Sequence, residues 1–291
     1  MRSVPRSVTH PGSKEIERLP FALSRGRAVT LALRGGQDLQ SAIAAALSDV
    51  GLYSGWLELE TASVDALAYV IPDKAPTAET VAWYSQTHHL RAPGLIHHLG
   101  LVVGQADGGL FLHGHGSWSE TDGATRFGHL LFAETMLAQD VIACGFLLDD
   151  ACFERLPDAE SNFSLFKPKS LSQPASNEAD FALLRMLPNE DLALGLDAVC
   201  ARLGWRQARV HGLGSLVGAD FEDGRLLDSF ATEFVIRDAL AHGPGMTDPG
   251  QHSGPEIVIV GEAGGAGLRG RVTRGANPVL VTAEILLQRL L

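Results

Sequence analysis

Long apolar runs are absent from this chain of 291 residues. No stretch approaches the roughly 18 to 20 consecutive apolar residues that a membrane-spanning helix needs. The polar start MRSVPRSVTHPGSKE also lacks the apolar core of a signal peptide. We therefore expect a cytoplasmic protein with no membrane partner.

Cysteine is rare in this chain, and acidic residues outnumber basic ones. The three cysteines, Cys144, Cys152 and Cys200, form no close pair, so we expect reduced thiols and no disulfide framework. The formal net charge is −11, which disfavours general nucleic-acid binding, because that affinity comes mainly from Lys and Arg neutralising phosphates. With 45% hydrophobic and 20% charged residues, the composition is typical of a globular protein.

The most informative feature present is a group of three histidines. His113 and His115 stand in FLHGHGSW, and His129 stands in RFGHLL. In a strand, residues two apart point to the same face, so His113 and His115 would project together. If residues 121–123 form a three-residue hairpin loop with its glycine in the left-handed conformation, His115 lies directly opposite His129. A two-residue loop would instead pair His115 with Leu130 and turn His129 to the other face.

Three imidazoles that converge and leave a fourth position open suit Zn²⁺, and imidazole also suits Ni, Cu and Fe. The alternative is that the histidines are polar residues on an exposed strand face. The apolar neighbours favour a buried hairpin, in which unpaired imidazoles would be costly; they are Phe111, Leu112, Trp118, Leu130 and Leu131. We therefore predict a metal site made of His113, His115 and His129, with zinc as the favoured ion.

Other polar residues are weaker candidates. Glu120 and Glu134 are acid/base candidates near the site, although each is more typical of a solvated surface, and no nucleophile–base set is visible. The sequence therefore leaves open whether the protein is an enzyme. The pairs His88-His89 and His97-His98 offer a fourth ligand, but such pairs more often lie in polar loops.

A tandem repeat organises the chain. The pattern at 36–39 recurs at 189–192, and each copy opens a stretch with helical apolar spacing that ends at Gly51 or Gly204. Strand-like runs follow both helices, so we expect two similar α+β units. The expected boundaries are a tail at 1–19, a first domain at 20–155, a linker at 156–182 and a second domain at 183–291.

The second unit lacks the histidines. Its glycine-rich stretch 264–272 aligns roughly with the histidine hairpin, and Arg271 falls near the position of His129. Arginine cannot ligate a metal, so we expect metal chemistry in the first unit only, with a structural or anion-binding second unit.

These motifs carry a family resemblance. The order GGxDLxxAI helix, SG strand, FLHGHGSWSETDG hairpin and GHLL strand resembles the PPC domain, the plants-and-prokaryotes conserved domain found fused to AT-hooks in plant nuclear proteins. The resemblance covers nearly all of 20–150 and, more loosely, 183–291. Segments 10–12, 162–166 and 277–280 are similar to bacterial proteins with two such domains in tandem.

The resemblance implies a compact α+β fold around an antiparallel sheet, one main helix per domain, and assembly as trimers of domains. It also implies a metal, often zinc, at the matching histidines. This sequence departs from the family where Phe127 precedes Gly128-His129, since Gly-Gly-His is commoner, and in the missing histidines of the second unit. We expect self-association as a trimer or pseudo-symmetric oligomer, and a regulatory or scaffolding role with a small-molecule ligand at the metal.

Two alternative functions stay open. DNA binding is implied by the family's association, and Arg25-Gly26-Arg27 has the core that can lie in an A·T-rich minor groove, although it runs into the apolar segment 28–31. A cupin-like metalloenzyme is the other, because His113, His115 and Glu120 approximate the cupin motif. Glu120 on the metal would favour a cupin, and His129 on the metal would favour the three-histidine site.

Overall fold

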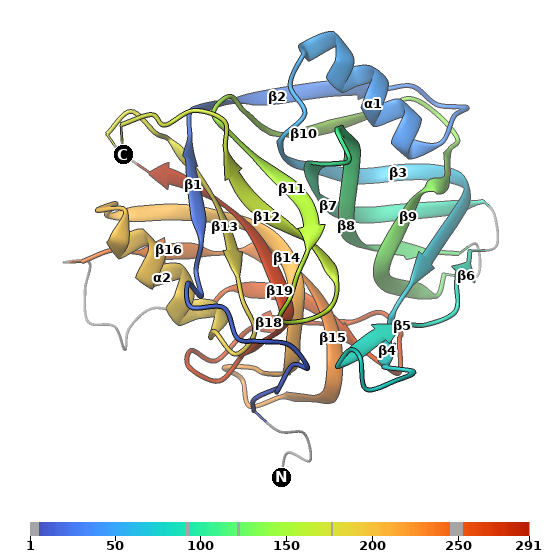
Figure 1. Ribbon diagram of the computed structural model, residues 1–291. Helices are drawn as coiled ribbons and strands as arrows, with labels where there is room; N and C mark the ends of the chain where they lie inside the picture. The colour runs from blue at the N-terminus through green and yellow to red at the C-terminus, as the bar shows by residue number, and fades with distance from the viewer. Residues whose placement is uncertain (1–5, 91–92, 121–122, 176, 245–252, 291) are drawn as a thin grey trace.

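The computed structural model describes residues 6–90, 93–120, 123–175, 177–244 and 253–290. The start of the expected tail and the loop residues Thr121 and Asp122 lie outside these ranges. Within these ranges, two helices, α1 (Leu39–Val50) and α2 (Leu192–Arg202), accompany two large sheets (Figure 1). Among the described residues, no helix combines the length and apolar character needed to cross a membrane.

The first sheet is formed by the first half of the chain. Its strands are β2 (Gly26–Leu33), β3 (Gly55–Val70), β6 (His88–His89), β7 (Gly94–Ala106), β8 (Gly109–Ser119), β9 (Thr125–Leu137), β10 (Val141–Leu148), β11 (Ala151–Pro157) and β12 (Ser164–Ser170). The order is β12-β11-β7-β8-β9-β3-β10-β2, with β6 paired to β3 and a further pairing of β7 with β3. All pairings are antiparallel except that of β11 with β7. A small separate ribbon joins β4 (Pro72–Lys74) to β5 (Ala82–Tyr84).

The second sheet is antiparallel and contains mostly the second half. Its strands are β1 (Phe21–Ser24), β13 (Phe181–Met186), β14 (Gln207–Asp220), β15 (Leu226–Asp238), β16 (Leu240–His242), β17 (Glu256–Gly261), β18 (Leu268–Arg271) and β19 (Val279–Leu290). The order is β1-β13-β19-β14-β15-β17-β18, with β16 paired to β14. The fold is α+β, with one helix packed on each antiparallel sheet, as predicted.

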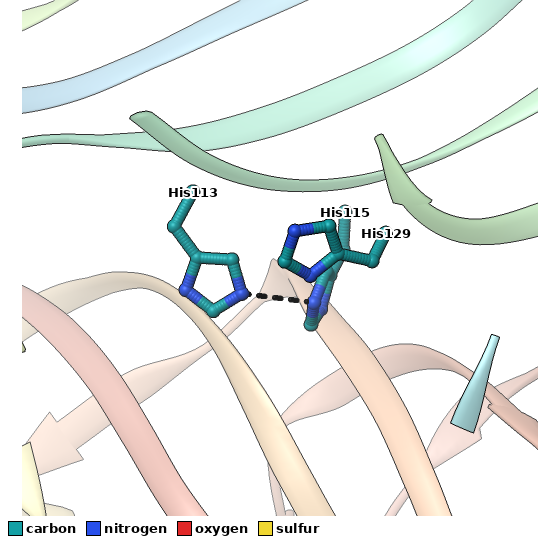
Figure 2. A group of neighbouring side chains, drawn as sticks. All are labelled: His113, His115 and His129. Carbon is teal, nitrogen blue, oxygen red and sulfur yellow. Dashed lines mark hydrogen bonds between the residues drawn. The ribbon is translucent and has the colours of Figure 1, made fainter. Parts of the chain in front are cut away.

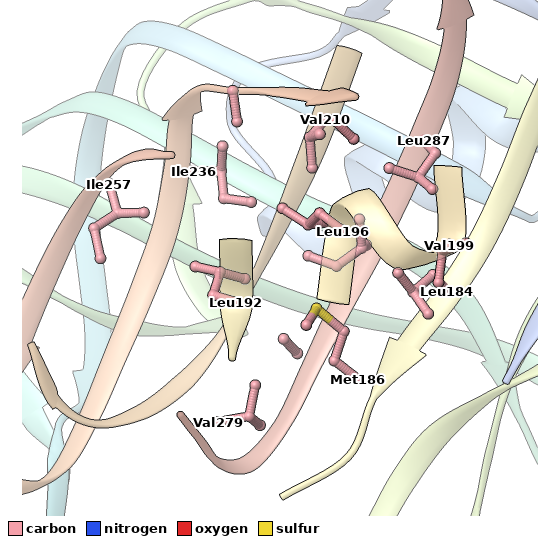
Figure 3. Close-up of a cluster of buried hydrophobic side chains, with 14 of the residues drawn as sticks. Leu184, Met186, Leu192, Leu196, Val199, Val210, Ile236, Ile257, Val279 and Leu287 are labelled. Carbon is pink, nitrogen blue, oxygen red and sulfur yellow. The ribbon is translucent and has the colours of Figure 1, made fainter. Parts of the chain in front are cut away.

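Both helices begin where the sequence places an aspartate. Asp38 and Asp191 each accept a hydrogen bond from a backbone N–H three residues ahead, which satisfies one free donor of the first turn. Gly51 ends α1 in the left-handed conformation, at φ 74°. The apolar face of α2 packs on the second sheet (Figure 3), through Leu192, Leu196 and Val199.

The two sheets share a core. Trp56, Val102 and Phe127 of the first sheet pack against side chains of the second that include Val235 and Leu286. The Val235 side chain packs closely on the backbone of Gly100, since a Cβ on Gly100 would lie 2.8 Å from Cγ2 of Val235. This packing places β15 against β8 and β9, and a backbone hydrogen bond from Phe127 N to Gly265 O crosses between the halves.

Two segments cross the expected boundaries, while the division into domains itself stays a prediction. Strand β1 pairs with β13 of the second sheet. Strand β12 lies within the expected linker and pairs with β11, and its Phe166 is buried, so this part of the expected linker packs on the first sheet. Cys144 is exposed, whereas Cys152 and Cys200 are buried, and all three are free thiols.

A buried ion pair fastens the segment after β11 to the second sheet. Asp158 Oδ1 accepts a hydrogen bond from Arg185 Nη1 at 2.8 Å, and both side chains are 1% exposed or less. Burial alone would raise the pKa of Asp158, but hydrogen bonds from Arg185 and Ser161 outweigh it and hold that pKa well below its usual range.

We predict that Asp158→Ala strongly destabilises the protein, because it leaves the Arg185 guanidinium buried without its carboxylate. The expected loss in the free energy of unfolding is about 3–5 kcal/mol, measured by urea denaturation. The control is Glu154→Ala, which removes the exposed pair with Lys169 and should cost about 1 kcal/mol or less. Similar losses for the two variants would contradict this role.

Candidate metal centre

The histidine hairpin has the predicted register. His115 on β8 pairs directly with His129 on β9. Gly123 is left-handed, at φ 81°, and its N–H donates to Glu120 O, while Glu120 N donates to Ala124 O. These hydrogen bonds close the turn, so period-two alternation sends His113, His115 and His129 to one face.

The three imidazoles converge on one point (Figure 2). His113 Nε2 lies 3.2 Å from His115 Nε2. One nitrogen from each ring lies within 4.8 Å of the other two, and the three side chains together could hold a metal ion. His115 is buried, and the side chains of His113 and His129 are 14% and 19% exposed.

The outer nitrogens of two rings are held by acceptors. His113 Nδ1 donates to Glu284 Oε2 at 2.6 Å, and His115 Nδ1 donates to the carbonyl oxygen of Phe234 at 2.8 Å. A carbonyl only accepts, so the His115 proton must be on Nδ1, and the carboxylate favours the same tautomer for His113. Both Nε2 atoms then carry lone pairs that face each other, an arrangement that a cation between them would satisfy.

The second half supplies two buried carboxylates that sequence reasoning missed. Glu284 comes from β19, and Glu233 comes from β15. Glu233 Oε1 lies 3.8 Å from both His115 Nε2 and His129 Nδ1. Within the described part of the chain, Glu233 Oε2 and His129 Nδ1 are buried without hydrogen-bond partners. These orphaned atoms beside the imidazoles fit a bound cation.

A local signal for both carboxylates exists in the sequence. Each is a single acidic residue inside an apolar strand, in ATEFVI around Glu233 and VTAEILL around Glu284. An isolated carboxylate in such a strand is costly unless a partner compensates it. The pattern indicates a buried polar contact, but it does not say that the partners are histidines from the first half.

Burial sets the protonation of the cluster. It lowers the pKa of His115 and His129 well below the usual value, and the nearby His113 lowers both further. Burial raises the pKa of Glu233 to about 8. Neutral imidazole is the form that ligates metals, so His115 and His129 are ready to bind at neutral pH.

A cavity of about 460 Å³ opens beside the imidazoles. Its lining residues include His113, His129, Glu284, Tyr84 and Arg155. The Tyr84 ring meets the His129 ring edge-on at 5.3 Å. Burial of its hydroxyl, followed by the charges of Glu233 and Glu284, raises the pKa of Tyr84 well above the usual value. A ligand of small-molecule size would fit beside the imidazoles.

The weaker candidates do not join the group. Of the residues that the sequence offered as candidates, His113, His115 and His129 form the group with ligand atoms within reach of one another, and this group does not include Glu120 or Glu134. Glu120 lies at the turn and Glu134 is exposed on β9. The arrangement therefore lacks the glutamate ligand of a cupin motif and contains the histidine that the hairpin register predicts. His88 and His89 are exposed on β6.

A second group of ligand-type side chains lies on β3 and β7, formed by Glu58, Glu60 and His98. Its two carboxylates already have hydrogen-bond donors from neighbouring side chains. Arg237 Nη2 donates to Glu60 at 3.1 Å, and Trp56 Nε1 donates to Glu58 at 2.8 Å. These contacts compensate the carboxylates without a metal.

The arginine near the expected equivalent of His129 is also paired. Arg271 contacts Asp238 at 2.7 Å and Glu256 at 3.6 Å. Its charge is therefore compensated within the second sheet.

Comparisons with known proteins give structural neighbours only. No protein-family model matches the chain, and no curated protein matches it. A metal-containing protein from Archaeoglobus fulgidus is 22% identical and covers 51% of this chain and 98% of its own, with a TM-score of 0.40. A plant- and prokaryote-conserved (PPC) protein from Pyrococcus horikoshii is 19% identical, with 51% and 94% covered and a TM-score of 0.37.

A third neighbour, from Ralstonia eutropha JMP134, is described as a "putative DNA-binding protein". It is 12% identical and covers 47% of this chain and 89% of its own, with a TM-score of 0.39. A PPC protein is thus among the structural neighbours, as the motif resemblance predicts.

We predict that Glu284→Gln weakens metal affinity about 10- to 100-fold, because the amide no longer provides a charged acceptor for His113 Nδ1–H. Competition titration with a zinc chelator measures the change. Glu134→Gln, which alters an exposed carboxylate on β9, is the matched control and should leave affinity unchanged. Equal zinc affinities for Glu284→Gln and the unsubstituted protein would show that the hydrogen bond from His113 to Glu284 does not support metal binding.

Glu233 should give the metal-free protein a characteristic pH dependence. Its pKa is raised from 4.5 to about 8 on folding, so its contribution to stability is fully present below the unfolded pKa and is lost as pH rises through the folded one. Between about pH 5 and about pH 8, chelator-treated Glu233→Gln should lose less stability than unsubstituted protein, by urea denaturation. Parallel profiles for the two proteins would count against a buried, protonated Glu233.

Proposed function

We propose that this chain is a metal-binding protein of PPC type in which His113, His115 and His129 hold one divalent transition metal. Zinc is the ion that three neutral imidazoles and an open position suit best. The observation that carries the proposal is the facing pair of Nε2 atoms, 3.2 Å apart, whose rings are fixed from behind by Glu284 and the Phe234 carbonyl. Without a cation, two buried lone pairs would oppose each other.

The residues around the three imidazoles have two different roles in the proposed centre. Glu284 and the Phe234 carbonyl orient His113 and His115 through their Nδ1 atoms. Glu233, 3.8 Å from two of the imidazoles, is placed either to add a carboxylate oxygen to the ligand set or to accept a proton from a bound group. When bound, the metal would supply positive charge that polarises an oxygen donor.

We further propose that the open position receives a small molecule from the adjoining cavity. The cavity volume of about 460 Å³ lies within the usual range for small-molecule sites, and two of the three histidines line it. Such a centre suits a regulatory protein that responds to its ligand, or a scaffold that the metal stabilises. Self-association as a trimer or pseudo-symmetric oligomer stays a prediction.

DNA binding has less support from the side chains. Arg25 Nη2 contacts Asp150 at 2.8 Å, and Arg27 Nη1 lies 3.7 Å from Asp149. Both arginines of the Arg-Gly-Arg segment therefore have carboxylate partners where the chain passes from β1 into β2. Phosphate contacts would have to compete with these ion pairs.

The test is metal content, measured by plasma mass spectrometry on zinc-loaded protein purified without a histidine tag. We predict about one zinc per chain, lost in the double variant His113→Ala/His129→Ala. The matched control is His88→Ala/His89→Ala, which removes two exposed histidines and should retain the metal. Zinc retained by the first variant, or a folded unsubstituted protein that takes up no zinc, would overturn the proposal.

A further inference from the structure

Arg155 presents a positive charge at the cavity beside the histidines. It is an exposed residue of β11 that lines the same cavity as His113, His129 and Glu284. Its guanidinium lies over the ring of Phe111, 4.9 Å from the centroid. Among the described residues, Arg155 forms no ion pair with an acidic side chain. A guanidinium held on an aromatic ring with its donors free is suited to bind an anion.

Aromatic rings form much of the remaining wall. Trp83 on β5 stacks on Phe163, with ring centroids 5.5 Å apart, and both line the cavity. Trp83 is 46% exposed and Tyr84 is 40% exposed, so aromatic surface is left open. Flat aromatic faces of this kind gain from stacking with a planar apolar group.

The charges of the site favour a monoanion. Arg155 provides one unit of positive charge at the cavity, and no acidic side chain among the described residues forms an ion pair with it. A carboxylate balances that unit, whereas a phosphate dianion exceeds it, although guanidinium can bind both.

We infer that the cavity binds an aromatic carboxylic acid, with its carboxylate paired to Arg155 and its ring against Trp83 and Phe163. This inference rests on the proposed metal-binding function, because the histidine centre and Arg155 line one cavity. It names the class of small molecule that the open position would meet.

The experiment is calorimetric titration of the zinc-loaded full chain with four probes. Phenylacetate has both ring and carboxylate, phenylacetamide lacks the charge, acetate lacks the ring, and phenyl phosphate carries the larger charge. We expect phenylacetate to bind at least about tenfold more tightly than each of the others, because only it satisfies both the charge-assisted pair and the aromatic wall.

Two variants complete the test. Arg155→Gln should weaken phenylacetate binding about tenfold or more while leaving phenylacetamide binding and zinc content unchanged. Arg34→Gln, which alters an exposed arginine outside the cavity lining, is the matched control and should bind phenylacetate normally.

The outcomes separate this inference from the proposed function. If zinc is bound but the amide or phenyl phosphate binds as tightly as phenylacetate, or Arg155→Gln has no effect, the inference is wrong and the metal centre stands. If the protein takes up no zinc, the proposed function fails and the inference fails with it.

Discussion

The hydrogen bonds behind the imidazoles are the constraint on which the site depends. Glu284 and the Phe234 carbonyl each take a proton from an Nδ1 atom, and so leave the inner nitrogens of His113 and His115 as acceptors facing each other. In a buried setting, such acceptors need a donor or a cation. Because both partners come from the second sheet, the site is complete only when the two halves pack together.

This geometry gives the second half a role despite its missing histidines. All three imidazoles come from the first half, whereas the buried carboxylates beside them come from β15 and β19. In the proposed centre, one half would present the ligands, and the other would orient them and add carboxylates. A second set of histidines is unnecessary for that proposal, since the three imidazoles lie where the faces of the two halves meet.

The sequence predicted the local parts of this structure well. Period-two alternation and the Gly123 turn were enough to place His115 opposite His129, and the pattern at 36–39 that recurs at 189–192 marked the start of both helices. It could not place Glu233 and Glu284 beside the histidines, because more than a hundred positions along the chain separate each glutamate from the three histidines. The pairing of β1 with β13 was missed for the same reason, since local patterns do not specify which sheet a short strand joins.

The most direct test of the central claim is a crystal structure of the zinc-saturated protein with diffraction data collected at the zinc absorption edge. The account predicts one anomalous peak at about 2.0–2.1 Å from Nε2 of His113, Nε2 of His115 and a nitrogen of His129. An anomalous peak at the Glu58, Glu60 and His98 group with none at the three imidazoles would contradict it. Crystals grown with excess zinc, in which the three imidazoles hydrogen-bond to one another and bind no metal, would contradict it equally.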